Sequence, residues 1–203
     1  FVLGLAQMNS PATARNGNLL SAGGMAVAIG ATAVLILSRQ LLGDGFSATG
    51  WIIILIGIAL GGGLGLYTAR TVKMTAMPQL VSLFNAVGGG AAALIAIDDY
   101  VRLAGAQTFA AGSWIPLEVS VPTVLDVVIG SITFTGSLIA SGKLMGLRIT
   151  PSRPVMIPGG RLVTAALALI TVAGALYLWT GNVSLPVMGV ILIAALVFGV
   201  TMT

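Results

Sequence analysis

Long uninterrupted apolar runs constrain the fold of this chain more than any other feature of its sequence. A helix needs roughly 20 apolar residues to cross the hydrocarbon core of a bilayer, and several runs come close to that length. They are Leu19–Leu37, Trp51–Tyr67, Met77–Ala96, Val124–Leu144, Leu162–Trp179 and Leu185–Met202. A membrane β-barrel would instead show short strands of alternating polarity. The sequence therefore predicts an all-α fold, a polytopic bundle of about six complete transmembrane helices.

The charge content agrees with a lipid environment and limits the chemistry. Charged residues make up 7% of the 203 residues, whereas soluble domains carry about 25%. The chain contains no cysteine and no histidine, so it offers neither thiolate nor imidazole to a metal or a proton. It also shows no carboxylate pair, no Ser/His/Asp set and no phosphate-binding glycine loop. We expect no catalytic residue, metal site or bound cofactor in these residues. We attribute the net charge of +4 to topology rather than to nucleic-acid binding.

The charges alternate in sign between successive connections. Three connections hold seven bases and no acid: Arg15; Arg70 and Lys73; and Lys143, Arg148, Arg153 and Arg161. The two others hold all the acids with only two bases: Asp44, Asp98, Asp99, Glu118 and Asp126, with Arg39 and Arg102. Basic connections stay on the cytoplasmic side of a membrane. We therefore place Arg15, Arg70–Lys73 and Lys143–Arg161 on the cytoplasmic or matrix side, and the longest connection, Ile97–Thr123, on the other.

The third apolar run carries the best functional candidate. Asn85 places a primary amide in the middle of that run, and a polar side chain at this depth usually faces a water-filled path or a partner helix. Gln79, Ser82 and Asn85 recur every third residue, so they share one side of the helix. The fourth run carries a stripe of hydroxyl residues at every fourth position: Thr133, Ser137 and Ser141.

If these two stripes face each other, they line a hydrated path across the membrane. We adopt this interpretation for Asn85, whose amide cannot titrate but can orient water. For Thr133 and Ser141 we favour a simpler role, a hydrogen bond to a carbonyl of their own helix or to a neighbouring helix. Asp126, near the start of the fourth run, either marks an entrance to the path or interacts favourably with the helix dipole. We favour the dipole interaction.

Two groups of glycines favour close helix packing. Gly57, Gly61 and Gly65 form a small-residue ladder on one face of the second run, and such ladders let helix backbones approach closely in lipid. The group at Gly88, Gly89 and Gly90 either packs in the same way or loosens the helix beside a cavity. Both interpretations of the second group remain open.

Two segments resemble the membrane domain of proton-translocating NAD(P) transhydrogenase, in the beta subunit that also carries the NADP(H)-binding domain. These are Val72–Ala93 (VKMTAMPQLVSLFNAVGGGAAA) and Ile132–Gly146 (ITFTGSLIASGKLMG). Weaker similarity continues through Pro154–Pro158 and Ala195–Thr203. Because Phe1–Leu5 reads as the end of a preceding helix, we expect residues 1–203 to be one transmembrane, proton-translocating domain within a larger chain.

The resemblance implies an enzyme that couples hydride transfer from NADH to NADP⁺ to inward proton flow. NAD(H) and NADP(H) would bind to other domains of the complex, and none would bind to these residues. The implied partners are those domains, additional membrane helices and a second copy of the complex in a homodimer. The implied location is the bacterial inner membrane, with the mitochondrial inner membrane as the alternative.

The resemblance also assigns residues to the proton path. Asn85 stands where some relatives have a histidine of the path, and Ser137 matches a polar residue that lines the same channel. The two polar stripes, rather than the resemblance, add Ser82, Thr133 and Ser141 as further candidates for the path. Because this chain has no histidine, we expect a histidine on a neighbouring segment to take that role.

Two other classes of function compete with this one. A secondary transporter or channel for a small solute or ion predicts broken helices and an inverted repeat, and no such repeat is visible. A scaffold subunit accounts for the glycine ladders but gives the polar stripes no purpose. A nucleotide-binding glycine motif after further helices would favour the transhydrogenase.

Overall fold

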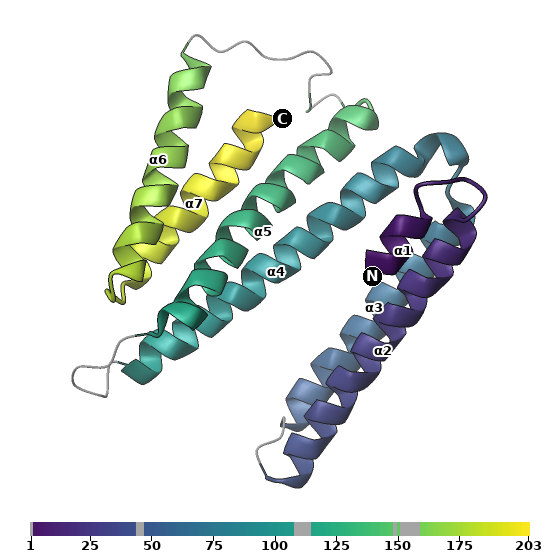
Figure 1. The fold of residues 1–203 in the computed structure, drawn as a ribbon, viewed down its shortest axis with the longest axis horizontal. Helices are drawn as coiled ribbons and strands as arrows, with labels where there is room; N and C mark the ends of the chain where they lie inside the picture. Colours follow the sequence, from purple (N-terminus) through teal and green to yellow (C-terminus); the bar gives the residue numbers. More distant parts are fainter. Residues whose placement is uncertain (1, 44–46, 108–114, 148–149, 151–158) are drawn as a thin grey trace. The chain divides into compact units, whose positions relative to one another are not determined.

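Helices make up nearly all of the described part of the chain. The computed structural model describes residues 2–43, 47–107, 115–147, 150 and 159–203, and these form helices and short turns (Figure 1). The helices are α1 (Val2–Gln7), α2 (Ala14–Leu41), α3 (Ala48–Thr71), the 3₁₀ turn η1 (Met74–Ala76), α4 (Met77–Gln107), α5 (Leu117–Leu144), α6 (Gly160–Trp179) and α7 (Leu185–Met202). Six of them, α2 to α7, are long and apolar enough to cross a membrane. The predicted all-α fold is confirmed.

The connection between α4 and α5 is much shorter than expected. The helices extend to Gln107 and from Leu117, so most of the predicted loop Ile97–Thr123 is helical. Arg102 Nε donates to Asp98 Oδ2 over 2.7 Å, one turn apart on α4, so these charges lie along a helix rather than in a loop. Pro122 lies inside α5 without ending it, although a proline removes a backbone donor and its ring crowds the carbonyl four residues earlier.

These longer helices change the interpretation of two polar residues. Asn85 is the ninth residue of the 31-residue α4, about 12 Å from its start at 1.5 Å per residue. It therefore lies in the half of the helix that begins at the basic end, about midway between that end and the middle of the helix. Asp126 is the tenth residue of α5, too far from the helix start for the expected dipole interaction. Glu118 is the acidic residue in the first turn of α5.

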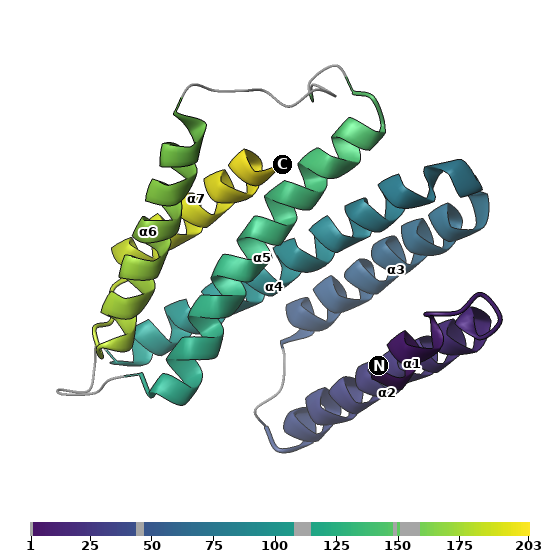
Figure 2. The ribbon, with the colours of Figure 1, turned by 45° about the horizontal axis from the view of Figure 1, so that its top comes forward.

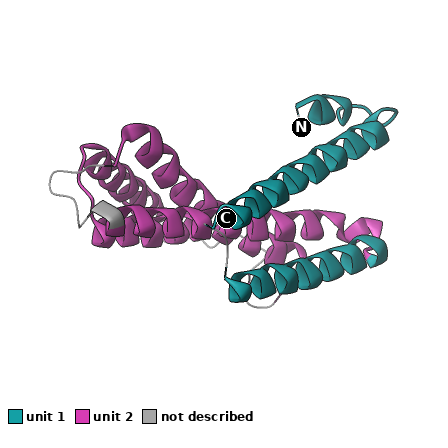
Figure 3. Ribbon diagram, turned by 90° about the horizontal axis from the view of Figure 1, so that it is seen from below, with its two compact units in different colours: residues 1–71 teal, residues 72–203 magenta. Residues whose placement is uncertain are grey.

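The chain divides into two compact units, residues 1–71 and 72–203 (Figure 3). In the first unit, α1 packs closely against the start of α2. A Cβ atom on Gly17 would lie 2.7 Å from the carbonyl oxygen of Gly4. Trp51 Nε1 donates to Gln40 Oε1 over 3.3 Å and so links the start of α3 to the end of α2.

In the second unit, α4 and α5 lie side by side in opposite directions, and α7 packs along α5 (Figures 1 and 2). The contact between α5 and α7 includes a hydrogen bond from Thr135 Oγ1 to the carbonyl oxygen of Leu196, 2.8 Å long. Helix α6 packs mainly on α7. Helix α5 is therefore the central helix of this unit.

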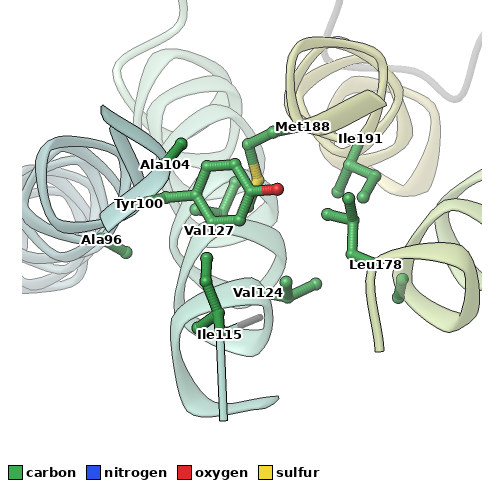
Figure 4. Close-up of a cluster of buried hydrophobic side chains, with 10 residues drawn as sticks. Ala96, Tyr100, Ala104, Ile115, Val124, Val127, Leu178, Met188 and Ile191 are labelled. Atoms are coloured by element: carbon green, nitrogen blue, oxygen red, sulfur yellow. The ribbon is translucent and has the colours of Figure 1, made fainter. Parts of the chain in front are cut away.

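A small apolar cluster joins α4, α5, α6 and α7 at the end of the unit that carries the acidic residues. Figure 4 shows the ring of Tyr100 next to Val127 and Met188, and 1% of Tyr100 is exposed. The backbone N–H of Ser184 donates to the Tyr100 hydroxyl over 3.0 Å. This bond ties the turn between α6 and α7 to α4, so the cluster fixes the unit at the end away from the basic residues.

Candidate functional site

The two polar stripes predicted from the sequence face each other along the contact between α4 and α5. We call this contact the polar seam, and it consists of Gln79, Ser82 and Asn85 on α4 with Ser137 and Ser141 on α5. Each of these five side chains takes part in a hydrogen bond between the two helices. The helices are antiparallel, so the start of one stripe meets the end of the other.

Ser137 is the centre of the seam. Asn85 Nδ2 donates to Ser137 Oγ over 2.8 Å. One turn closer to the basic end, Ser82 Oγ donates to the backbone carbonyl of Ser137 over 2.7 Å. A single residue of α5 therefore accepts hydrogen bonds from two polar side chains of α4.

The basic end of the seam is held by two reciprocal hydrogen bonds. Gln79 Nε2 donates to the carbonyl oxygen of Leu144 over 2.7 Å, and Ser141 Oγ donates to the carbonyl oxygen of Gln79 over 3.1 Å. Leu144 is the last residue of α5, and the last carbonyls of a helix lack intrahelical partners. The Gln79 amide supplies one. Ser141 is 2% exposed, and its bond to a neighbouring helix is one form of the simpler role that we favoured for it.

Beyond Asn85 the seam closes into direct backbone contact. A Cβ atom on Gly89 would lie 2.8 Å from Thr133 Cβ and 2.9 Å from the Gly130 carbonyl oxygen. A Cβ atom on Gly130 would lie 2.6 Å from the Gly89 carbonyl oxygen and 2.8 Å from the Ala93 nitrogen. The hydrogen-bonded part of the seam thus extends only from the basic end to Asn85.

Thr133 and Asp126 lie on the acidic side of this closure. Thr133 is half-buried against Gly89, and within the described residues no hydrogen bond of its hydroxyl is found, not even to its own helix. Asp126 is exposed on α5 and makes no ion pair with the described residues. Neither residue joins the seam, although both lie on the α5 face that extends it.

Asn85 retains hydrogen-bonding capacity at the open side of the seam. The residue is exposed, its Nδ2 atom binds Ser137, and its Oδ1 atom accepts no hydrogen bond from the described residues. The hydroxyl proton of Ser137 likewise has no acceptor there. An amide oxygen and a hydroxyl proton next to each other are the groups that a water molecule needs as partners.

The predicted glycines differ in their surroundings. Gly89 and Gly90 on α4 touch Thr133 and Phe134 on α5, and a Cβ atom on Gly90 would lie 2.9 Å from the Phe134 ring. Gly88, next to them, has open space at its Cβ position. The ladder of the second run also has open space at all its positions: Gly57, Gly61 and Gly65. A packing role for that ladder remains a prediction.

Several close contacts were not singled out from the sequence. Gly130 and Gly199 lie at backbone crossings of α5 with α4 and α7, where a Cβ atom would meet backbone carbonyls of the neighbouring helix. Gly130 has no small residue four positions away, whereas Gly199 follows Ala195 by four residues on α7. Thr135, which bonds α7, does not stand out in the sequence because hydroxyl residues are common in membrane helices. The sequence predicts that Gln79 lies on the polar stripe of α4, but it does not predict the hydrogen bond of Gln79 to the end of α5.

The seam contains no group that titrates near neutral pH, since amides and hydroxyls are its only polar side chains. The part of the chain that the structure describes also holds no group of His, Cys, Asp or Glu residues able to bind a metal ion. The chemistry of the seam is therefore limited to orienting water and passing on hydrogen bonds.

Comparison with known proteins identifies the family to which this chain is related. The sequence profile of the NAD(P) transhydrogenase beta subunit family matches residues 1–203. The chain belongs to this family. The resemblance seen in Val72–Ala93 and Ile132–Gly146 is thereby confirmed, and the chain is homologous to an enzyme subunit.

Two curated relatives support the assignment. Both are described as NAD(P) transhydrogenase subunit beta, one from Rhodospirillum rubrum and one from a defined strain of that organism. Each is 37% identical to this chain over 163 residues, which cover 78% of the chain and 31% of the relative. The chain thus spans less than a third of the length of these relatives.

Proposed function

We propose that residues 1–203 form the proton-translocating membrane domain of a proton-translocating NAD(P) transhydrogenase. Family membership, the six helices long enough to span a membrane and the polar seam support this proposal. Hydride transfer from NADH to NADP⁺ takes place in other domains, which bind the two nucleotides. This domain conducts the protons that move inward during that reaction.

The observation that carries the proposal is the hydrogen bond from Asn85 Nδ2 to Ser137 Oγ. It fixes the amide so that Oδ1 remains available to water, and it leaves the Ser137 hydroxyl proton free to be donated. A water molecule between these two atoms has both a donor and an acceptor, which proton movement along hydrogen bonds requires. Polar groups inside membrane helices commonly mark such pathways.

The path has a basic-side half and an acidic-side half. Ser82 and Ser141 belong to the basic-side half, which the seam lines. Thr133 and Asp126 belong to the other half, with Asp126 at the entrance. The close contact between Gly89 and Gly130 separates the two halves on the α4–α5 line, so protons pass it through groups supplied by other helices of the complex.

The titrating group of the path belongs to another segment. Asn85 and Ser137 do not ionise in the physiological range, and the chain has no histidine. We propose that an imidazole on a neighbouring helix approaches the exposed side of Asn85. The partners are therefore further membrane helices and the NAD(H)- and NADP(H)-binding domains, assembled as a homodimer of the complex.

The charge pattern supports an orientation. Arg15, Arg70–Lys73 and Lys143–Arg161 lie on the cytoplasmic side of the inner membrane, by the rule that basic connections are retained there. Asp44, Arg148 and Arg153 contribute to the sequence pattern but lie outside the described residues. The basic end of the polar seam then opens toward the nucleotide-binding domains.

The test uses the intact complex in sealed liposomes with its nucleotide domains outside. NADPH drives the reduction of an NAD⁺ analogue, and a dye reports the internal pH. We expect reduction with internal acidification, and a faster reaction when an uncoupler removes the proton gradient. Folded complex that shows neither reduction nor acidification would contradict the proposal and lead to a substrate screen for a transporter.

A further inference from the structure

Two hydrogen bonds hold the basic end of the polar seam together. Gln79 Nε2 donates to the Leu144 carbonyl and Ser141 Oγ donates to the Gln79 carbonyl. Together the two bonds tie the first turn of α4 to the last turn of α5. We call this pair of bonds the clasp.

The clasp lies close to the functional part of the seam. Gln79 precedes Ser82 by three residues and Asn85 by six, which correspond to about 4.5 Å and 9 Å along a helix. Every hydrogen-bonding contact in this interval is direct: side-chain donors of α4 and α5 meet protein acceptors. Water entering from the basic end therefore meets the Gln79 amide before it reaches Ser82.

The two bonds of the clasp differ in how easily they break. The Ser141 hydroxyl is buried and bonds backbone. The Gln79 amide sits at the end of a flexible side chain, and its acceptor is a terminal helix carbonyl that water can satisfy equally well. Rotation of the Gln79 side chain thus breaks the bond to the Leu144 carbonyl without moving either helix.

We propose that Gln79 is the residue that opens and closes the basic end of the polar seam, acting as a positioning residue rather than as a proton carrier. The inference rests on the proposed function of the seam and adds the point at which its access to water is controlled. An amide suits this role because it donates to a carbonyl and yet carries no charge that would trap a proton.

The test measures access of a charged thiol reagent to Ser82→Cys, one turn beyond the clasp. None of the 203 residues is a cysteine, and reaction elsewhere in the complex is measured in the parent without the substitution. The complete complex is placed in inside-out vesicles, so that the basic end faces the reagent, a membrane-impermeant methanethiosulfonate. The rate of labelling is compared with and without Gln79→Ala.

We expect Gln79→Ala to raise the labelling rate several-fold and up to about tenfold, the range that corresponds to the net contribution of one hydrogen bond. Gln79→Glu at pH 8 serves as a second variant. It keeps the size of the side chain, but an ionised carboxylate cannot donate to the Leu144 carbonyl, so it should also raise the rate. Thr75→Ala is the matched control, an exposed polar residue just before α4 that forms no hydrogen bond across the seam within the described residues.

Folded Gln79→Ala and Gln79→Glu complexes that label at the parent rate would overturn the proposal, as would an equal increase in Thr75→Ala. Labelling reports water access and requires no proton transfer. An unchanged labelling rate therefore contradicts the role proposed for Gln79 and has no bearing on the proton path. A failed proton-coupling test of Asn85 contradicts the proton path and has no bearing on the role of Gln79.

Discussion

The side-chain nitrogen of Asn85 lies 2.8 Å from the hydroxyl oxygen of Ser137 and donates a hydrogen bond to it across the contact between α4 and α5. Two residues 52 positions apart in the chain thus form one polar site. The bond uses one donor of the amide and leaves its oxygen free on the exposed side. The site is incomplete without water or a side chain from another segment.

Ser137→Ala removes the acceptor that orients the Asn85 amide. If one hydrogen bond contributes about 1 kcal/mol, proton-coupled turnover should fall about fivefold. Ser137→Thr keeps the hydroxyl and should retain most of the activity. The rate of internal acidification in sealed liposomes measures the effect. Thr164→Ala is the control, because that hydroxyl donates to the Gly160 carbonyl of its own helix; a loss of similar size in this control would remove the case for Ser137.

Gly89→Ala should destabilise the contact between α4 and α5. The new methyl group would lie 2.9 Å from a backbone oxygen and 2.8 Å from a side-chain carbon of α5, and forced overpacking typically costs about 1–3 kcal/mol. Gly88→Ala is adjacent but enters open space, so it should leave stability unchanged or raise it by up to about 1 kcal/mol through helix propensity. Thermal unfolding in detergent distinguishes them. Equal stability of the two variants would mean that α4 and α5 do not touch at Gly89.

Tyr100→Phe should loosen the turn between α6 and α7. The ring packing against Met188 is kept, but the Ser184 N–H loses its acceptor, and a buried unpaired donor costs about 1–3 kcal/mol. Hydrogen exchange at the Ser184 amide should become faster. Tyr177→Phe, at an exposed tyrosine on α6, is the control. Unchanged exchange in Tyr100→Phe would show that the hydroxyl does not hold the turn.

The helices and the faces of the seam are predictable from the sequence because both follow from periodicity. A run of about 20 apolar residues has few alternatives to a spanning helix, and polar residues at every third or fourth position must share a face. The spacing therefore places Gln79–Asn85 on one face of α4 and Thr133–Ser141 on one face of α5, but it does not show that the two faces meet. Their hydrogen-bond partners cannot be predicted, because these depend on the register of α4 against α5.

The errors of the sequence prediction have physical causes. The sequence prediction misplaces the end of α4 and the start of α5 because Asp98, Asp99 and Pro122 are typical of loops. A helix that extends beyond the bilayer nevertheless tolerates charges and even a proline. The helix-dipole role of Asp126 was wrong for the same reason. Gly130 could not be predicted from the sequence. A single crossing of two backbones needs only one small residue on each helix, so it produces no repeating pattern of small residues.

Coupling in the Asn85→Leu variant tests the central claim most directly. The intact complex is reconstituted in sealed liposomes with Val87→Leu as the control, an exposed position on the same helix. If the polar seam conducts protons, Asn85→Leu complex inserts and binds nucleotides normally, but internal acidification and coupled hydride transfer both fall, and an uncoupler does not restore them. Acidification and coupled turnover equal to those of Val87→Leu would show that Asn85 has no part in the path.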